Sequence, residues 1–251
     1  MKKSFFLFIN TIFIITFLSA QPPGRSGVNN AQGNFSQYYN KTLTEATTKN
    51  STGSMLNGFN NEENTVGKRF LFDEWVEGDS VIDTKGNLVN TTAFNFNFDK
   101  LTGGLLVTQD KINNMLVASN GINSFTLKNR GKTYFFTHVN TIQPDPFFLE
   151  MVKSDAHYSL YKRFVTKYIA SNYRNDGVIQ TGNNYNEYKD ENEYYVIDAA
   201  TKLSQRVTLK PKSIKASFPL EKEKVNRYFK EHNNVETDEK FLTGLVNYLN
   251  Q

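Results

Sequence analysis

The sequence feature that most constrains the fold is a succession of short extended segments. They are rich in β-branched and aromatic residues, and clusters of Gly, Asn and Asp separate them at intervals of about ten residues. The segments are Leu105–Val107, Met115–Val117, Phe125–Leu127, Tyr134–Phe136, Phe147–Leu149 and Tyr158–Phe164. Connections this short leave no room for crossover helices. The pattern predicts a mainly β fold, an antiparallel meander that forms a curved sheet or a partly open barrel.

Local patterns add detail to this meander. Ala93 to Phe98 alternates Phe with Asn, which predicts a strand with its Phe side chains in the core and its Asn side chains in water. Asn120-Gly121 and the run from Asn129 to Lys132 predict tight hairpin turns. We also expect turns at Glu77–Asp79 and over the polar stretch Asn183–Glu193.

The last forty residues change from strand to helix periodicity. The pattern predicts two to three short helices packed on the sheet, because helices this short are not stable alone. Pro211 to Phe218 is a short turn or the first helix, Pro219 suits the start of the next helix, and Thr237 can cap the last. Their apolar faces contain Val225, Tyr228, Phe229 and His232, then Phe241, Leu242, Leu245, Val246 and Leu249.

The N-terminus predicts export. Lys2 and Lys3 form a basic start, Phe5–Phe17 is apolar, and Ala20 offers a cleavage position before Gln21. The apolar run is shorter than the ~20 residues that span a bilayer, so we expect no transmembrane segment after signal removal. We expect a periplasmic or outer-membrane-associated protein, with secretion as the alternative.

Composition divides the chain into four parts. We expect a signal peptide over residues 1–20 and a disordered linker rich in Asn, Ser and Gly over residues 21–66. The antiparallel β domain then covers residues 67–209, and the helical cap covers residues 210–251.

The sequence lacks the residues that several kinds of catalytic and metal site require. The chain has no cysteine, which excludes thiol nucleophiles and thiolate metal sites. The formal charge of +4 falls to +2 without Lys2 and Lys3, which gives no reason to expect a nucleic-acid partner. His138, His157 and His232 form no zinc motif, and no G-x-S-x-G elbow is present. We therefore predict no cofactor and no metal.

Acidic pairs are the remaining enzymatic possibility. Asp73 and Glu74 would point to opposite faces of a strand, so they cannot share one cleft. The acidic residues between Glu187 and Glu193 fall in a hydrophilic stretch that we interpret as a solvated loop. With no catalytic motif, we expect that the protein is not an enzyme.

Tyrosine is dense between His157 and Ile197, which contains eight of the thirteen tyrosines of the chain. Tyrosine offers a stacking face and a hydroxyl, both used in the recognition of glycans and proteins. It is also a good strand former, and half-buried sheet tyrosines are the ordinary alternative. The candidate ligand-binding residues are Tyr158, Tyr161, Tyr168, Tyr185 and Tyr188.

Several segments resemble a group of uncharacterised exported proteins of Bacteroidota. The similar segments are Asp79–Asp83, Phe96–Leu105, Thr108–Asp110, Tyr158–Lys162, Tyr194–Val196 and the closing helical pair. They cover the chain from about Lys68 to the C-terminus and mark strands and turns. The resemblance implies export and a β-rich fold, and it implies no activity.

These observations favour a non-enzymatic cell-envelope protein that acts as a binding or accessory module. Its partner would be an envelope protein or a glycan. One alternative is a carbohydrate-binding or carbohydrate-active protein that uses the tyrosine-rich half. Another is a subunit of an outer-membrane assembly.

Overall fold

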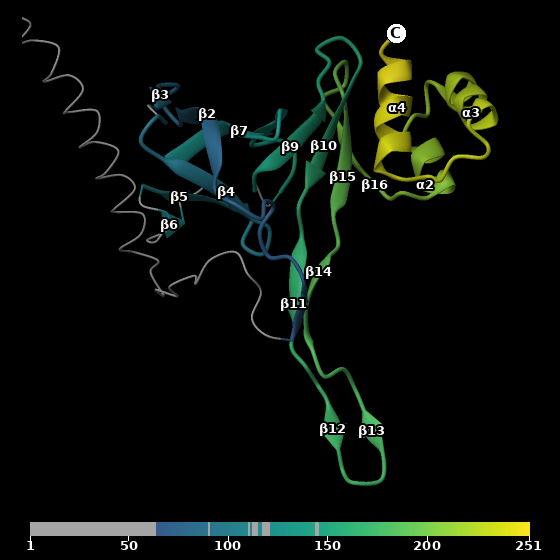
Figure 1. Ribbon diagram of the computed structural model, residues 1–251. Coiled ribbons are helices and arrows are strands. Elements are labelled where there is room, and N and C mark those ends of the chain that lie inside the picture. The colour runs from purple at the N-terminus through teal and green to yellow at the C-terminus, as the bar shows by residue number, and fades with distance from the viewer. Residues whose placement is uncertain (1–63, 90, 110, 112–114, 117–120, 144–145) are drawn as a thin grey trace, which may run out of the picture.

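A computed structural model describes residues 64–89, 91–109, 111, 115–116, 121–143 and 146–251. The predicted fold class is confirmed: the chain is mainly β, its main sheet is antiparallel and not closed into a barrel, and three short helices follow it (Figure 1). The predicted signal peptide and almost all of the predicted linker lie outside the described residues. Thr65 and Val66, which we assigned to the linker, belong to the first strand.

The main sheet has the strand order β16-β15-β10-β9-β8-β7-β2-β4-β5-β6, and β3 pairs with β2. Figure 1 shows β2 and β7 running across the direction of β10 and β15, so the sheet is strongly curved. The strands of this sheet are β2 (Val76–Asp83), β3 (Leu88–Val89), β4 (Asn95–Asp99), β5 (Gly104–Thr108), β6 (Met115–Leu116), β7 (Ile122–Asn129), β8 (Lys132–Thr137), β9 (Phe148–Val152), β10 (Tyr158–Arg163), β15 (Glu193–Asp198) and β16 (Ser204–Val207).

Phenylalanine fills the interior of the curved half of this sheet. The ring of Phe136 stacks on Phe98 and Phe125, with centroid distances of 4.7 and 4.8 Å. Phe94, Phe96 and Phe98 all contact this core, as their alternation predicts.

The prediction that the intervening Asn side chains face water is wrong for Asn97, which is 0 % exposed. Its side chain accepts a hydrogen bond from the Phe72 amide and donates to the carbonyls of Phe72 and Glu74. The segment before β2, which pairs with β4 at Phe70 and Asp99, therefore encloses the Asn97 side chain. A buried amide is stable there because its donors and acceptor are used.

One predicted turn is confirmed and one is wrong. Arg130 and Gly131, between β7 and β8, have φ angles of 49° and 76°, as a tight turn with two left-handed residues requires. Glu77–Asp79 is not a turn, because β2 continues through it with a register shift between Gly78 and Ser80. Asn120, in the other predicted hairpin turn, lies outside the described residues.

Three helices form the predicted C-terminal cap: α2 (Pro211–Ala216), α3 (Lys222–Glu231) and α4 (Glu239–Leu249). Buried side chains of α4 pack with Leu160 and Val196 of the sheet in one hydrophobic cluster. The cap of α4 is Asp238 rather than Thr237, because the Asp238 carboxylate accepts the Phe241 amide at 2.8 Å. The second helix begins three residues after Pro219.

Two strands of the main sheet continue beyond it as a narrow ribbon, which we call the arm (residues 166–190). The arm contains β11 (Thr166–Ile169), β12 (Arg174–Asn175), β13 (Gln180–Thr181) and β14 (Asn186–Asp190), and β1 (Thr65–Gly67) lies parallel to β14. Figure 1 shows the arm projecting away from both the curved sheet and the helices. The interpretation of Asn183–Glu193 as a loop is therefore wrong, since most of it is strand.

Candidate functional site

The root of the arm is fixed to the body by charged side chains. Lys100, from the turn between β4 and β5, is buried, and its Nζ lies 2.7 Å from the Asp190 carboxylate. The same carboxylate accepts the hydroxyl of Thr166 at 2.5 Å. These contacts join both strands of the root to the curved half of the sheet, so the direction of the arm is set by the body.

The strand β1 adds a second anchor on the outer edge of β14. The Asn186 amide donates to the carbonyl of Asn64 at 2.8 Å. Gly67 has a φ of 77°, and a Cβ at this position would lie 2.0 Å from the carbonyl oxygen of Tyr188. Only glycine permits this close approach of the two backbones. Two residues further along the chain, Arg69 forms a part-buried ion pair with Asp99 at 2.7 Å.

Asn and Ser side chains continue the ribbon between the paired strands. The Asn172 side chain accepts the Asn183 amide at 2.8 Å, and the Asn172 amide donates to the Asn183 carbonyl at 3.2 Å. Ser171 donates its hydroxyl to the same carbonyl and its amide to the Asn186 side chain. These bonds join the two strands where regular pairing is interrupted, so the arm is one continuous element.

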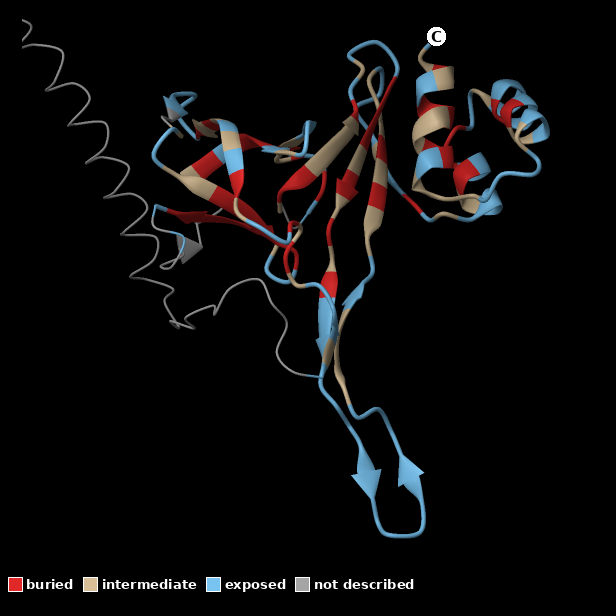
Figure 2. Ribbon diagram, in the orientation of Figure 1, coloured by how far each residue is buried: buried red, intermediate tan, exposed pale blue. Residues whose placement is uncertain are grey.

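The tip of the arm exposes aliphatic side chains. Val178 is 91 % exposed and Ile179 is 60 % exposed. Figure 2 shows exposed residues along the distal arm, which we define as residues 170–185 and in which only Tyr185 is half-buried. The Asp176 carboxylate accepts the Ile179 amide at 3.0 Å, and hydrogen bonds from Ile179 and Val178 lower the pKa of Asp176. The tip therefore combines two aliphatic side chains with a fixed negative charge.

The five candidate tyrosines do not form one surface. Tyr158 is 7 % exposed and packs edge-on against Phe218 beneath the helical cap. Tyr161 lies half-buried in a small cluster around Phe148. Tyr168 and Tyr188 lie opposite each other on the arm with ring centroids 5.2 Å apart, and the half-buried Tyr185 immediately precedes β14.

Burial changes the titration of the tyrosines in the body. Burial and the neighbouring Glu150 carboxylate raise the pKa of Tyr161 to about 12. Burial and Glu239 also raise the pKa of Tyr194, whose hydroxyl donates to Glu239 at 2.7 Å. Lys162 lies 2.5 Å from the same carboxylate. Tyr194 and Lys162 thus hold Glu239, and with it α4, on the sheet, so their role is structural.

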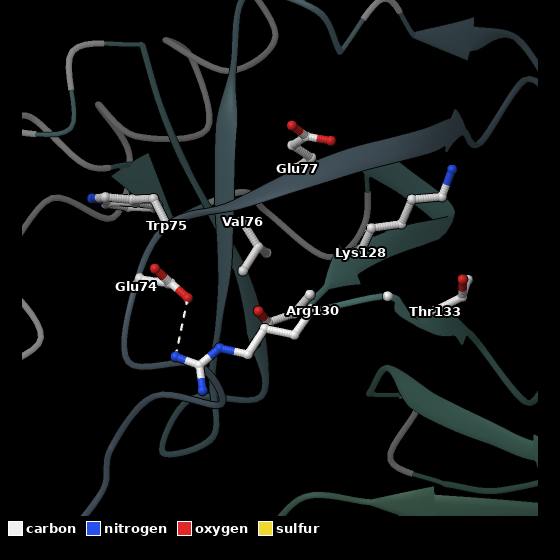
Figure 3. A pocket seen from close by; sticks show the side chains of 9 residues that line it. Glu74, Trp75, Val76, Glu77, Lys128, Arg130 and Thr133 are labelled. Carbon is white, nitrogen blue, oxygen red and sulfur yellow. Dashed lines mark hydrogen bonds and ion pairs between the residues drawn. The ribbon is translucent and has the colours of Figure 1, made fainter.

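A shallow groove of about 560 Å³ lies on the curved half of the main sheet, at β2, β7 and β8. Figure 3 shows Trp75 and Glu74 on one side of it and Lys128 and Thr133 on the other. Glu74 and Arg130 form an exposed ion pair at 3.4 Å. The remaining lining residues are Val76, Glu77, Asn129 and Gly131. Aromatic, acidic and basic groups thus meet in one open depression.

The residues considered for catalysis are dispersed. Within the described ranges, no three His, Asp or Glu residues are grouped to hold a metal ion. His138 and His232 bond to the carbonyls of Ile122 and Tyr228. Glu193 lies beside Arg163 and Arg206, at 3.2 and 2.9 Å. None of the helices that the structure describes is long and apolar enough to cross a membrane.

The tip of the arm was missed by the sequence reasoning, although it has a local signal. Asn175-Asp176-Gly177 is a strong turn sequence, and Gly177 has the left-handed φ of 87° that such a turn uses. The polar stretch Asn183–Glu193, which follows the tip, favours a loop over a strand.

Comparisons with known proteins found no matching family model, no similar curated protein and no similar solved structure. The geometry of the arm and the groove is therefore the basis for a functional proposal.

Proposed function

We propose that the protein is a non-enzymatic, exported cell-envelope protein that acts as a binding or accessory module and binds a partner protein through the distal arm. The observation that carries the proposal is the anchored projection with Val178 and Ile179 exposed at its end. Apolar side chains that are exposed side by side mark interaction surfaces more often than single ones do.

The chemistry of the arm favours a protein over a lipid or a charged polymer. The arm contains three basic and three acidic residues, so its formal charge is zero. A neutral surface does not attract phosphate-rich polymers. Insertion of the tip into a bilayer would also bury the ionised Asp176 carboxylate, which is costly.

A crosslinking experiment in cells tests this proposal. Since the chain has no cysteine, a single Val178→Cys substitution gives the tip a unique attachment point for a photoreactive label. We expect a discrete protein adduct after illumination of intact envelopes. Leu220→Cys is the control, because Leu220 is also exposed but lies between α2 and α3. Equal labelling at the two positions, or no adduct at the tip, would refute the proposal.

A second candidate function is glycan binding in the groove. Trp75 offers an aromatic face, and the Glu74 and Arg130 pair beside it offers hydrogen-bonding groups at a solvent-exposed position. Isothermal titration with a panel of neutral and acidic oligosaccharides tests it. Binding that is lost in Trp75→Ala and kept in Val178→Asp would support it, and no binding to any of these sugars would reject it.

A further inference from the structure

One edge of the arm is open at β11. In the sheet order β1-β14-β11, β1 fills the outer edge of β14, and among the described strands none pairs with the outer edge of β11. Lys167, Tyr168 and Ile169 are all exposed, so solvent reaches both faces of β11. An open edge presents backbone donors and acceptors to a further strand.

The register identifies the backbone groups that point toward this edge. Hydrogen-bonded and non-hydrogen-bonded pairs alternate along two antiparallel strands. The Glu191 amide donates to the Val165 carbonyl at 2.7 Å. Two residues further on, Lys167 and Lys189 are therefore the next hydrogen-bonded pair. Tyr168 follows Lys167, so its amide and its carbonyl point away from β14 and into the open edge.

The other edge of the same ribbon already carries an added strand. The Asn186 amide points outward from β14 and donates to the Asn64 carbonyl at 2.8 Å. From there β1 runs beside β14 as far as the pair of Gly67 and Tyr188. This contact joins segments that are 121 residues apart in the sequence. The ribbon thus accepts an extended segment on one edge, and β11 offers outward groups of the same kind on the other.

The side chains beside the open edge determine which segment fits it. On one face, the ring of Tyr168 lies 5.2 Å from that of Tyr188, so a further aromatic ring beside Tyr168 would extend this row. On the other face, Ile169 is exposed and offers an aliphatic surface. Lys167 lies on the same face as Ile169 and is the one charged side chain of β11.

Lys167 makes this edge selective for charge. Lys167 and Lys189 lie directly opposite each other, where like charges are destabilising. Their ammonium groups share one carboxylate, that of Glu191, at 2.5 and 3.9 Å. Glu187, the other acidic residue of this face, lies opposite Ile169 instead. A carboxylate on an added strand beside Lys167 would offset the second ammonium group, whereas an added lysine would meet uncompensated charge.

We propose that this edge binds an extended segment of another protein that carries an aliphatic, an aromatic and an acidic side chain in that order. The segment pairs antiparallel to β11, the more stable arrangement per residue. Its aromatic residue exchanges both backbone hydrogen bonds with Tyr168, and its outer two residues lie beside Ile169 and Lys167. This surface is at the root of the arm and is separate from the tip that carries the proposed function. With so few outward groups, the contact is weak on its own and does not survive purification.

Nuclear magnetic resonance of the isotope-labelled chain tests this contact. The probe is the peptide acetyl-Thr-Thr-Val-Tyr-Glu-Thr-Thr-amide, titrated to millimolar concentration. We expect the Tyr168 amide resonance to move downfield and its hydrogen exchange to slow, because this amide gains an acceptor. The amides of Lys167 and Ile169 already point toward β14, so their resonances should move much less.

N-methylated peptides test the backbone pairing. N-methylation of the peptide's tyrosine removes the donor that faces the Tyr168 carbonyl, and it should abolish the shift. N-methylation of the adjacent glutamate is the matched control, because that amide points away from β11 and the shift should remain. Equal effects of the two modifications would overturn the inference.

Charge exchange tests the selectivity. In Lys167→Glu the peptide should bind about fivefold more weakly, and a peptide with lysine in place of its glutamate should bind this variant about as well as the original pair. Lys167 is exposed, so circular dichroism should be unchanged. No shift of the Tyr168 amide, or equal affinity of the unmodified chain for the two peptides, would overturn the inference.

The free chain provides a further check. A Tyr168 amide resonance that shifts with protein concentration alone would show that a second copy fills the edge, and it would also overturn the inference. Crosslinking from Val178→Cys in envelopes reports on the tip alone. The proposed function and the contact at β11 can therefore fail independently.

Discussion

The two halves of one ribbon differ sharply in what surrounds them. Near the body, β10 and β15 carry Leu160 and Val196, which are buried under the helical cap. Beyond the body, β11 and β14 continue the same two strands, yet Tyr168 and Ile169 are exposed there. Both halves are rich in tyrosine and both are antiparallel pairs. The difference lies in the helices, which cover only the first half.

This contrast assigns different roles to tyrosines in the same ribbon. Tyr194 in the covered half donates to Glu239 and holds α4 in place. Tyr168 in the projecting half contacts Tyr188 and otherwise faces solvent. A tyrosine-rich sequence thus serves stability where it is covered, and under the proposed function it is available for recognition where it is exposed. Substitutions in the two halves should therefore separate folding from binding.

The largest effect is expected in the covered half. Leu160→Ala removes a side chain that is fully buried against α4, which should lower the free energy of unfolding by about 2–5 kcal/mol. Ile169→Ala, on the same ribbon in the exposed half, should change it by less than about 0.5 kcal/mol. Urea unfolding followed by circular dichroism measures both. Similar losses for the two variants would show that the arm is part of the folding core.

The next effect concerns the attachment of β1 to the arm. Gly67→Ala would place a Cβ against the Tyr188 carbonyl in a left-handed conformation, so we expect β1 to detach at a cost of about 2–3 kcal/mol. Gly86→Ala is the matched control, because Gly86 has a φ of 83° with nothing within 4 Å. It should cost only about 1 kcal/mol.

Hydrogen exchange distinguishes the two glycine variants. The Asn186 amide, which donates to Asn64, should lose protection in Gly67→Ala and keep it in Gly86→Ala. Unchanged protection in Gly67→Ala would contradict the role of β1 as an anchor of the arm.

A smaller effect is expected from the ion pair at the root. Asp190→Asn leaves the buried Lys100 ammonium without its carboxylate, which should cost about 1–3 kcal/mol and increase exchange of β11 amides. Asp73→Asn is the control, since its pair with Lys68 is largely exposed and should contribute at most about 1 kcal/mol. Equal losses of unfolding free energy in the two variants would show that the Lys100–Asp190 ion pair does not anchor the arm.

The smallest expected effect is a pH dependence of stability that arises from Tyr161, in the covered half of the ribbon. The folded pKa of Tyr161, about 12, lies above the usual value of 10. A raised folded pKa favours the protonated form in the folded state, so this stabilisation is complete below pH 10 and is lost as the pH rises to 12. Unfolding midpoints measured across this window should fall less steeply in Tyr161→Phe than in the unmodified chain. An identical slope would contradict the role of burial and Glu150.

Local patterns in the sequence predict much of the fold but little of the arm. The hairpin turn at Arg130 and Gly131 and the apolar stripe of α4 follow from short-range rules, and both are present. Asn97 was misassigned because the segment that covers it lies more than twenty residues away in the sequence. The strand β1 pairs with β14 across 121 residues, a distance at which periodicity carries no information.

The candidate site was predictable only in part. Tyrosine density directs attention to the ribbon, but it cannot separate the covered Tyr158 from the exposed Tyr168. That separation depends on where the helical cap ends, which is a tertiary property. The tip, by contrast, has the local turn sequence Asp176-Gly177 and could have been predicted from it.

Removal of residues 171–185, which are all of the distal arm except Ala170, tests most directly whether the arm is a binding element. Replacing residues 171–185 by Asn-Gly joins β11 to β14 in their existing register, with Ala170 opposite Asn186. We predict that the free energy of unfolding stays within about 0.5 kcal/mol of the unmodified chain, because the removed residues are almost all exposed. Co-purification of the partner protein with the chain from solubilised envelopes should be lost. A destabilised fold, or association that survives the deletion, would contradict the claim that this element exists to bind.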